Sequence, residues 1–134
     1  MYRVLLVDDE PNILSALRRS LAAIDARQLD GEALHLETFT SPEAAVRRSD
    51  EEDFDLVISD YRMPSMNGVE FLTRIMELQP SVPRMIISGF ADREAIIAAI
   101  NEVNLMRFIE KPWNDDVLRQ AVVSILRGRV APSG

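Results

Sequence analysis

The chain has 134 residues, of which 47% are hydrophobic and 28% charged. This length and composition are typical of a single globular domain with a hydrophobic core. Its net charge of −7 argues against direct nucleic-acid binding, which usually needs a basic surface, but leaves a basic protein partner open. It contains no cysteine, which excludes disulfides, thiolate metal sites and cysteine nucleophiles. No apolar run approaches membrane-spanning length and acids directly follow the first run, so we expect no membrane span, no signal peptide and a cytoplasmic location.

The first elements along the chain are predicted to be a buried strand and a helix. Residues 3–7 are almost wholly apolar and lead directly into Asp8-Asp9-Glu10. A run without alternation is typical of a strand covered on both faces, as in a parallel sheet. Pro11 suits a first helical turn, and apolar side chains then recur at helical spacing at Ile13, Leu14, Leu17, Leu21 and Ile24. Residues 25–33 indicate a connection longer than a strand–helix unit requires.

The same alternation continues to the end of the chain. Strands are predicted over residues 34–39, 56–59, 83–88 and 106–109, and helices over 42–49, 68–78, 92–103 and from Asn114 onward. Ser41 is expected to cap the helix that starts at Pro42. The expected core stripes of the last two helices are Ala95, Ile96, Ala99, Ile100 and Val103, and then Val117, Leu118, Ala121, Val122 and Ile125. Residues 1–127 would form the domain, and 128–134 a tail or the start of a linker.

Strands that alternate with helices through short connections predict the α/β class. The expected architecture is a doubly wound, five-stranded parallel sheet flanked by five helices, with right-handed crossovers. A flavodoxin-like strand order, 2-1-3-4-5, would place the first and third strands side by side, at the switch point where such sheets bind ligands.

Polar residues follow the apolar runs of four of the five predicted strands. In chain order they are Asp8 and Asp9, Asp60, Ser88 and Lys111. Because the carboxyl ends of parallel strands share one edge, three carboxylates, one hydroxyl and one ammonium should converge there. Each has an ordinary local explanation as a cap or turn residue, and Gly89 and Asp92 are expected to serve the start of the next helix. Their coincidence at four strand ends favours a functional site.

Three carboxylates at one edge need a positive charge nearby that offsets their mutual repulsion. Two unit charges about 4 Å apart repel by roughly 4 kcal/mol at an effective dielectric of about 20. Oxygen ligands without histidine or cysteine suit a hard cation such as Mg²⁺. We expect the central acid, Asp60, to accept a phosphoryl group. Lys111 would neutralise one phosphoryl oxygen and Ser88 would donate a hydrogen bond to another.

These residues and their neighbours resemble the receiver domain of bacterial two-component response regulators. The matching residues are Asp8-Asp9, Asp60 with Met63-Pro64 and Gly68, Ser88-Gly89, and Phe108 followed by Lys111-Pro112, in order within residues 3–127. The resemblance implies a CheY-like fold and a role in phosphorelay signal transduction, in which a sensor histidine kinase or phosphotransfer protein donates its phosphoryl group to Asp60. It also implies a phosphoacceptor switch rather than an enzyme, with self-phosphorylation from small donors and autodephosphorylation as its only chemistry.

The resemblance assigns the remaining roles at the site. Mg²⁺ or Mn²⁺ would be held by Asp8, Asp9, Asp60 and the backbone carbonyl of Arg62. Ser88 would be the switch hydroxyl, Lys111 the lysine that binds the phosphoryl group, and Phe108 the aromatic switch residue.

An output surface is implied as well. An output domain or partner protein would bind the face formed by the fourth helix, the fifth strand and the fifth helix, and a homodimer through this face is left open. Its apolar candidates are Ile97, Met106, Phe108 and Trp113, although Trp113 could instead pack against the last helix.

Two alternatives to the switch stay open. One is a receiver-like interaction module that is not phosphorylated. The other is an Asp-nucleophile phosphohydrolase, which would want a second acid where Arg62 stands. The only histidine, His35, is expected to be an edge-strand side chain. Residues 60–64, 88–92 and 111–113 further resemble receivers that precede HD-GYP phosphodiesterase outputs.

Overall fold

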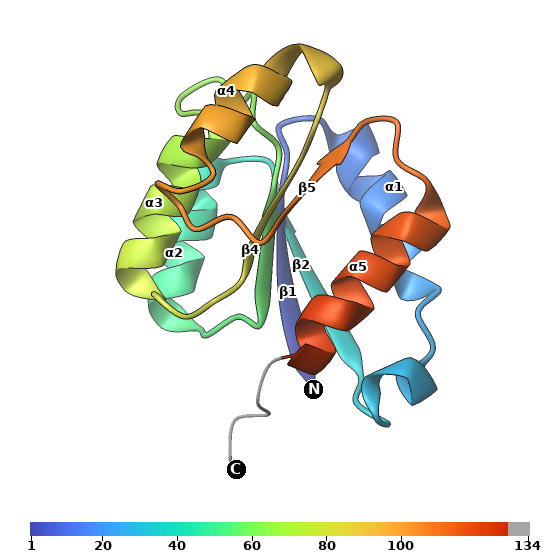
Figure 1. Ribbon diagram of the computed structural model, residues 1–134. Coiled ribbons are helices and arrows are strands. Elements are labelled where there is room, and N and C mark those ends of the chain that lie inside the picture. The colour runs from blue at the N-terminus through green and yellow to red at the C-terminus, as the bar shows by residue number, and fades with distance from the viewer. Residues whose placement is uncertain (129–134) are drawn as a thin grey trace.

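The computed structural model describes residues 1–128, which form one parallel sheet flanked by helices (Figure 1). The strands are β1 (Tyr2–Val7), β2 (Leu34–Phe39), β3 (Leu56–Ser59), β4 (Arg84–Ser88) and β5 (Arg107–Glu110). The helices are α1 (Pro11–Ala22), α2 (Pro42–Glu51), α3 (Gly68–Leu78), α4 (Arg93–Ala99) and α5 (Asp115–Gly128), with two short 3-10 helices, η1 (Ala26–Leu29) and η2 (Phe90–Asp92). The predicted tail lies outside the described residues, except for Gly128, which ends α5.

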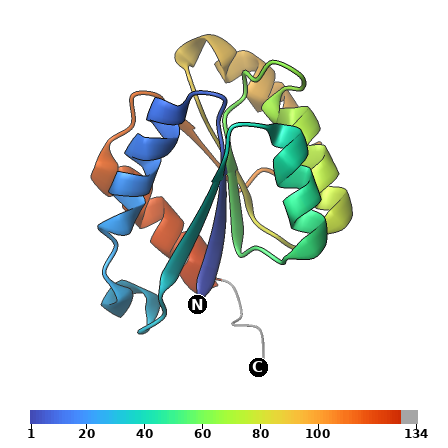
Figure 2. The same cartoon turned by 180° about the vertical axis from the view of Figure 1, so that it is seen from behind.

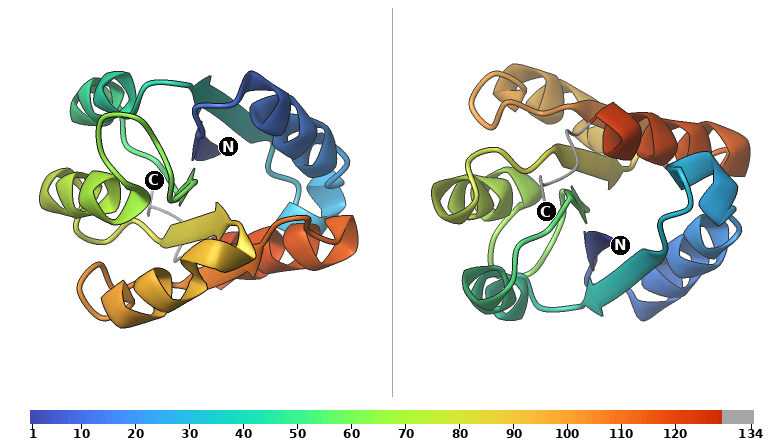
Figure 3. Two further views of the ribbon diagram at one scale, coloured as in Figure 1. Left: turned by 90° about the horizontal axis from the view of Figure 1, so that it is seen from above. Right: turned by 90° about the horizontal axis from the view of Figure 1, so that it is seen from below.

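The strand order is β2-β1-β3-β4-β5 and all neighbouring pairs are parallel, which confirms the predicted topology. Helices α1 and α5 cover one face of the sheet, and α2, α3 and α4 cover the other (Figures 1 and 3). The view from behind brings the edge strand β2 to the front (Figure 2). Within residues 1–128, none of the helices is both long and apolar enough to cross a membrane.

Strand β1 shows why its sequence lacks alternation. Val4 and Leu6 belong to the hydrophobic cluster under α1 and α5, whereas Leu5 and Val7 belong to the cluster under α2, α3 and α4. All four side chains are buried. Burying such a side chain contributes about 1.5–3 kcal/mol, so both faces of the strand favour apolar residues.

Strand β2 lies at the edge of the sheet, and an ion pair between Glu37 and Arg48 connects it to α2. His35 is exposed on this strand, as predicted. Glu37 is mostly buried and accepts a hydrogen bond from Arg48 Nε at 2.8 Å, while Arg3 Nη1 lies 3.4 Å from its other oxygen. The hydrogen bond from Arg48 is the main reason that the pKa of Glu37 is lowered.

The fourth helix is shorter than predicted. It spans Arg93–Ala99 rather than 92–103, and the chain continues in turns to Asn104, which has a positive φ of 48°. The buried Arg84 on β4 donates from Nε to the carbonyl of Val103 at 2.7 Å and thereby holds these turns against the sheet. Ala95 is exposed and Ile100 is half-buried, so the buried part of the predicted stripe is Ile96, Ala99 and Val103.

Other boundaries differ by a turn or less. Helix α2 continues beyond the predicted end at Ser49 to Glu51. On α5, Val117 is exposed and Leu126 is buried, which moves the core stripe around the helix. The long connection 25–33 contains η1, whose four residues are too few to show a helical period; it is capped by Asp25.

Helix α3 begins where the backbone passes very close to the site. Gly68 donates its N–H to the carbonyl of Tyr61 at 2.7 Å, and Asn67 and Glu70 form a reciprocal capping box. A Cβ on Gly68 would stand 2.3 Å from the carbonyl oxygen of Asp60. Glycine is therefore required at position 68, because the backbone of Asp60 leaves no room for a Cβ atom.

Replacing Gly68 by alanine should lower the free energy of unfolding by about 1–3 kcal/mol, because the added methyl group must push the Asp60 peptide aside. Urea unfolding measures the change. Gly89→Ala is the matched control, since a Cβ there meets nothing within 4 Å. Equal stability of the two variants would contradict the steric argument.

Replacing Arg48 by methionine should lower the urea concentration at the unfolding midpoint at pH 7, because Glu37 loses its main hydrogen-bond donor. The pKa of Glu37 is lowered from its ordinary 4.5, so this stabilisation is present above pH 4.5 and is lost as the pH falls through the lowered value. Urea unfolding between pH 7 and pH 3 should show the two proteins converging on the acid side. Arg47→Met, at the exposed neighbour, should show no such pH dependence.

Candidate functional site

The candidate site lies at the carboxyl edge of the sheet, where backbone hydrogen bonds extend the strands by one residue. Asp8 donates its N–H to the carbonyl of Phe39, and Asp60 donates its N–H to the carbonyl of Val7 at 2.9 Å. Lys111 donates its N–H to the carbonyl of Ser88 at 2.9 Å. The ladder thus fixes where each side chain leaves the sheet.

The five residues predicted from the strand ends come together. Oxygens of Asp8, Asp9 and Asp60 all lie within 4.8 Å of one another. Lys111 Nζ lies 3.0 Å from Asp8 Oδ2 and 3.4 Å from Asp60 Oδ1. The hydroxyl oxygen of Ser88 lies 2.9 Å from the same Asp60 Oδ1. Three carboxylates, one ammonium and one hydroxyl therefore share a single edge.

Burial shapes the charges of this cluster. Asp8 is 1% exposed, and its burial raises its pKa even though the Glu10 N–H and Lys111 donate to the carboxylate. Burial alone would favour neutral Lys111, but its hydrogen bonds and attraction to Asp8 and Asp60 outweigh this and raise the pKa of the amine. One ammonium faces three acids, so the site retains an excess of negative charge that a bound cation would relieve.

The donor set fits a hard divalent cation. The three acids offer only oxygen, and no sulfur or imidazole lies among the clustered ligands of residues 1–128. A hollow of about 540 Å³ opens beside the acids and is lined by Asp9, Tyr61, Arg62, Met63, Pro64, Asn67 and Asp92. A larger hollow of about 600 Å³ lies between α1, α5 and residues 111–113. It shares only Lys111 with the acidic cluster, so the chemistry of the side chains locates the site better than volume does.

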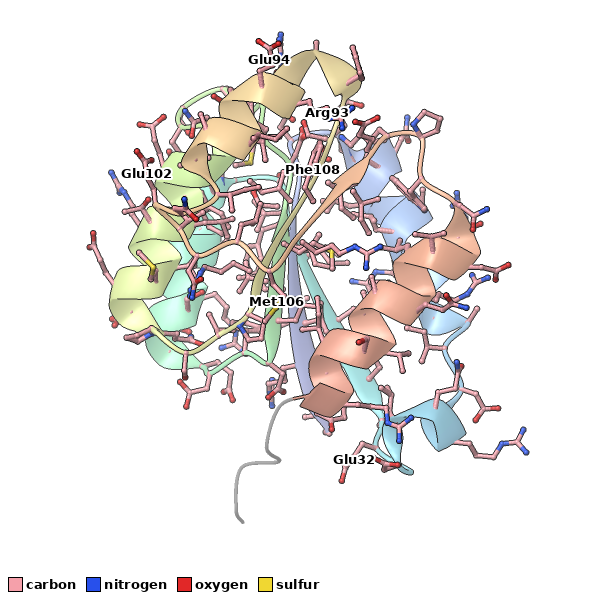
Figure 4. The ribbon with its side chains drawn as sticks, in the orientation of Figure 1. Glu32, Arg93, Glu94, Glu102, Met106 and Phe108 are labelled. Carbon is pink, nitrogen blue, oxygen red and sulfur yellow. The ribbon has the colours of Figure 1, made fainter. Side chains whose placement is uncertain are left out.

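The predicted switch and output residues lie on β5 and α4. Phe108 is half-buried and packs against the cluster that contains Ile96 and Val103. Figure 4 shows Phe108 on β5 between Met106 and Arg93, the first residue of α4. Ile97 and Met106 are 51% and 58% exposed.

Trp113 does not join this face. It packs with the cluster under α1 and α5, and its Nε1 donates to Asp115 Oδ1 at 3.0 Å. The alternative expectation, packing against the last helix, is the one that the structure supports.

One residue of the site was misassigned from sequence. Asp92 was expected to serve the start of α4, but its side chain makes no capping hydrogen bond there. It is 6% exposed; Ser88 Oγ lies 3.1 Å from its Oδ2, and Arg62 Nε donates to its Oδ1 at 2.7 Å. No pattern along the chain marks this role, because Arg62 lies 30 residues away on a different loop.

Comparison with known proteins agrees with this geometry. The family model of the response regulator receiver domain matches residues 4–123. The hydrogenase transcriptional regulatory protein HoxA of Cupriavidus necator is 38% identical over 123 residues, which cover 89% of this chain and 24% of that protein. HoxA of Bradyrhizobium diazoefficiens is 40% identical over 119 residues, covering 89% of this chain and 23% of that protein. The chain thus spans about a quarter of the length of these relatives.

A solved structure supports the same assignment. The signal receiver domain of an HD domain-containing protein from Pseudomonas fluorescens superposes with a TM-score of 0.81 and 31% sequence identity, covering 93% of this chain and 94% of that one. The sheet order, the clustered acids and the family match over residues 4–123 lead to one conclusion. The chain belongs to the response regulator receiver domain family.

Proposed function

We infer that Asp60 is the phosphoacceptor of this receiver domain and that its phosphorylation controls an output. The proposal depends on which groups surround one carboxylate oxygen, Asp60 Oδ1. Asp60 Oδ1 lies 2.9 Å from the Ser88 hydroxyl and 3.4 Å from Lys111 Nζ, while Asp8 and Asp9 crowd the same edge. Of the three acids, Asp60 alone has both a hydroxyl donor and an ammonium beside it in the part of the chain that the structure describes.

The proposed reaction is a phosphoryl transfer. A carboxylate oxygen of Asp60 attacks the phosphorus of a phosphohistidine on a sensor histidine kinase or phosphotransfer protein. The P–O bond forms as the P–N bond breaks, and the electron pair returns to the imidazole nitrogen. Lys111 would neutralise one phosphoryl oxygen and Ser88 would donate a hydrogen bond to another, which their contacts with Asp60 Oδ1 support. Attack by water on the phosphorus later releases phosphate and restores Asp60.

Small donors such as acetyl phosphate would react in the same way, with breakage of a P–O bond in place of the P–N bond. The residues that would hold Mg²⁺ or Mn²⁺ are Asp8, Asp9 and Asp60, together with the backbone carbonyl of Arg62. When bound, the cation supplies positive charge that offsets the carboxylates and the transferring phosphoryl oxygens.

The proposed output surface is the face of α4 and β5, with α5 beside them. Exposed Ile97 and Met106 support it, and half-buried Phe108 lies between this face and the site. An output domain, a separate partner or a second copy of the chain would bind there. Residues 1–127 are proposed as the receiver domain, and residues 128–134 as a tail or the start of a linker. The two HoxA relatives are named transcriptional regulatory proteins, which makes a transcriptional output one candidate.

The alternatives are less well supported. A phosphohydrolase would need an acid at Arg62, whose side chain is instead paired with Asp92. A receiver-like module that is never phosphorylated would have no use for the contacts of Lys111 and Ser88 with Asp60.

Incubation with acetyl phosphate and Mg²⁺ should add one phosphoryl group, because Asp60 lies between its donors with two further acids to hold the cation. Intact-mass measurement detects the adduct. Asp60→Asn should show none, whereas Asp50→Asn, an exposed acid of α2, should react like the native chain. An adduct that survives in Asp60→Asn would place the phosphoryl group elsewhere. If the native chain formed no adduct with any phosphoryl donor, the receiver-like interaction module that is not phosphorylated would be favoured.

Mg²⁺ alone should stabilise the fold, because it relieves repulsion among Asp8, Asp9 and Asp60. At a concentration one hundred times its dissociation constant the expected gain in the free energy of unfolding is about 2.7 kcal/mol. Urea unfolding with Mg²⁺ and with EDTA measures the gain. It should fall sharply in Asp9→Asn and persist in Asp50→Asn; an equal gain in both variants would argue against Asp9 as a ligand.

A further inference from the structure

Asp92 is a buried carboxylate that the proposed reaction does not use. It ends η2, directly before α4, and its two oxygens contact Arg62, on the loop between β3 and α3, and Ser88, the last residue of β4. Its Oδ1 accepts from Arg62 Nε at 2.7 Å, and its Oδ2 lies 3.1 Å from Ser88 Oγ. The same Ser88 oxygen lies 2.9 Å from Asp60 Oδ1. Ser88 therefore stands between two carboxylates.

Local explanations do not account for this placement. Asp92 does not cap α4 with its side chain. The pair with Arg62, whose side chain is 71% exposed, accounts for one oxygen of Asp92 only, because Arg62 Nε donates to Oδ1. A carboxylate that is only 6% exposed needs partners for both oxygens, and for Oδ2 that partner is the hydroxyl of Ser88.

The two acids in contact with Ser88, Asp60 and Asp92, compete for its hydroxyl proton. A serine hydroxyl has one proton to donate, and ionised carboxylates have none to give in return. At any moment only one of the acids, Asp60 or Asp92, receives that proton. A phosphoryl group on Asp60 that takes a hydrogen bond from Ser88 must therefore compete with Asp92 for that proton.

We propose that Asp92 is a positioning residue, held by Arg62, that competes with the phosphoryl group on Asp60 for the proton of the Ser88 hydroxyl. The proposal rests on the proposed function of Asp60 and deepens it. Asp92 immediately precedes α4, so the loss of its donor on phosphorylation acts on the first turn of the helix that carries exposed Ile97. The contact sets both how tightly the site holds a phosphoryl group and how the state of the site reaches α4.

Asp92→Asn isolates the contact with Ser88. Its side-chain oxygen can still accept from Arg62 Nε, while its NH₂ can donate to Ser88 Oγ, which leaves the serine proton free for the phosphoryl group. The probe is BeF₃⁻ with Mg²⁺, a noncovalent stand-in for the phosphoryl group, titrated by amide NMR. The half-saturating concentration should fall about three- to tenfold in Asp92→Asn. Asp92→Ala, which removes the competing acceptor altogether, should shift it in the same direction.

The decisive comparison repeats the substitution in a Ser88→Ala background. With no hydroxyl to compete for, Asp92→Asn should change the half-saturating concentration by less than about twofold. If Ser88→Ala does not saturate, the same pair is compared by the rate at which the phosphoryl adduct is lost. Asp50→Asn, which removes an equal charge from exposed α2, should match the native chain.

Three outcomes overturn the proposal in distinguishable ways. An unchanged or weaker affinity in Asp92→Asn, with a native chain that binds the probe, overturns the role of Asp92 alone. An equal gain in the Ser88→Ala background shows that removing charge, rather than freeing the hydroxyl, is the cause, and also overturns it. A native chain that neither binds the probe nor forms an adduct overturns the function proposed for Asp60 and this inference with it.

Discussion

The crowding of three carboxylates against one lysine at the carboxyl edge of the sheet is the constraint on which the rest of the site depends. Asp8, Asp9 and Asp60 stand within 4.8 Å of one another, and Lys111 Nζ is 3.0–3.4 Å from two of them. Burial makes this arrangement costly, which is why the pKa of Asp8 is raised although Lys111 donates to it. The parallel ladder makes it durable, because backbone hydrogen bonds beyond each strand keep the acids from moving apart.

The same constraint supports the proposed route from the site to α4. A charged, tightly held edge cannot accept further negative charge without redistributing its hydrogen bonds, and the donor most easily redistributed is a hydroxyl that can rotate. Ser88 contacts acids on two loops, and the second, Asp92, precedes α4. With seven residues α4 is the shortest α-helix in the described range, and it leaves Ile97 exposed. Short elements with few buried contacts are where local rearrangement costs least.

Much of the fold followed from local sequence patterns. Unbroken apolar runs predicted central strands, and β2, β3 and α3 begin and end where the pattern placed them. The errors have physical causes. Apolar spacing continued past Ala99, but the turns after it are held by Arg84, a residue on another element. Ala95 fitted the stripe by its spacing, yet a small side chain at the margin of a stripe gains little from burial and stays exposed.

The sequence by itself determined the class of fold, the edge at which the polar residues meet and the identity of the five residues there, because strand ends in a parallel sheet are positioned by the backbone. Only the tertiary structure decided what Asp92 and Trp113 contact. Arg62 and Asp92 are 30 residues apart and belong to different loops, and Trp113 turns toward α1 and α5 rather than toward α4. Such contacts depend on how loops pack above the sheet, and no periodicity along the chain encodes that packing.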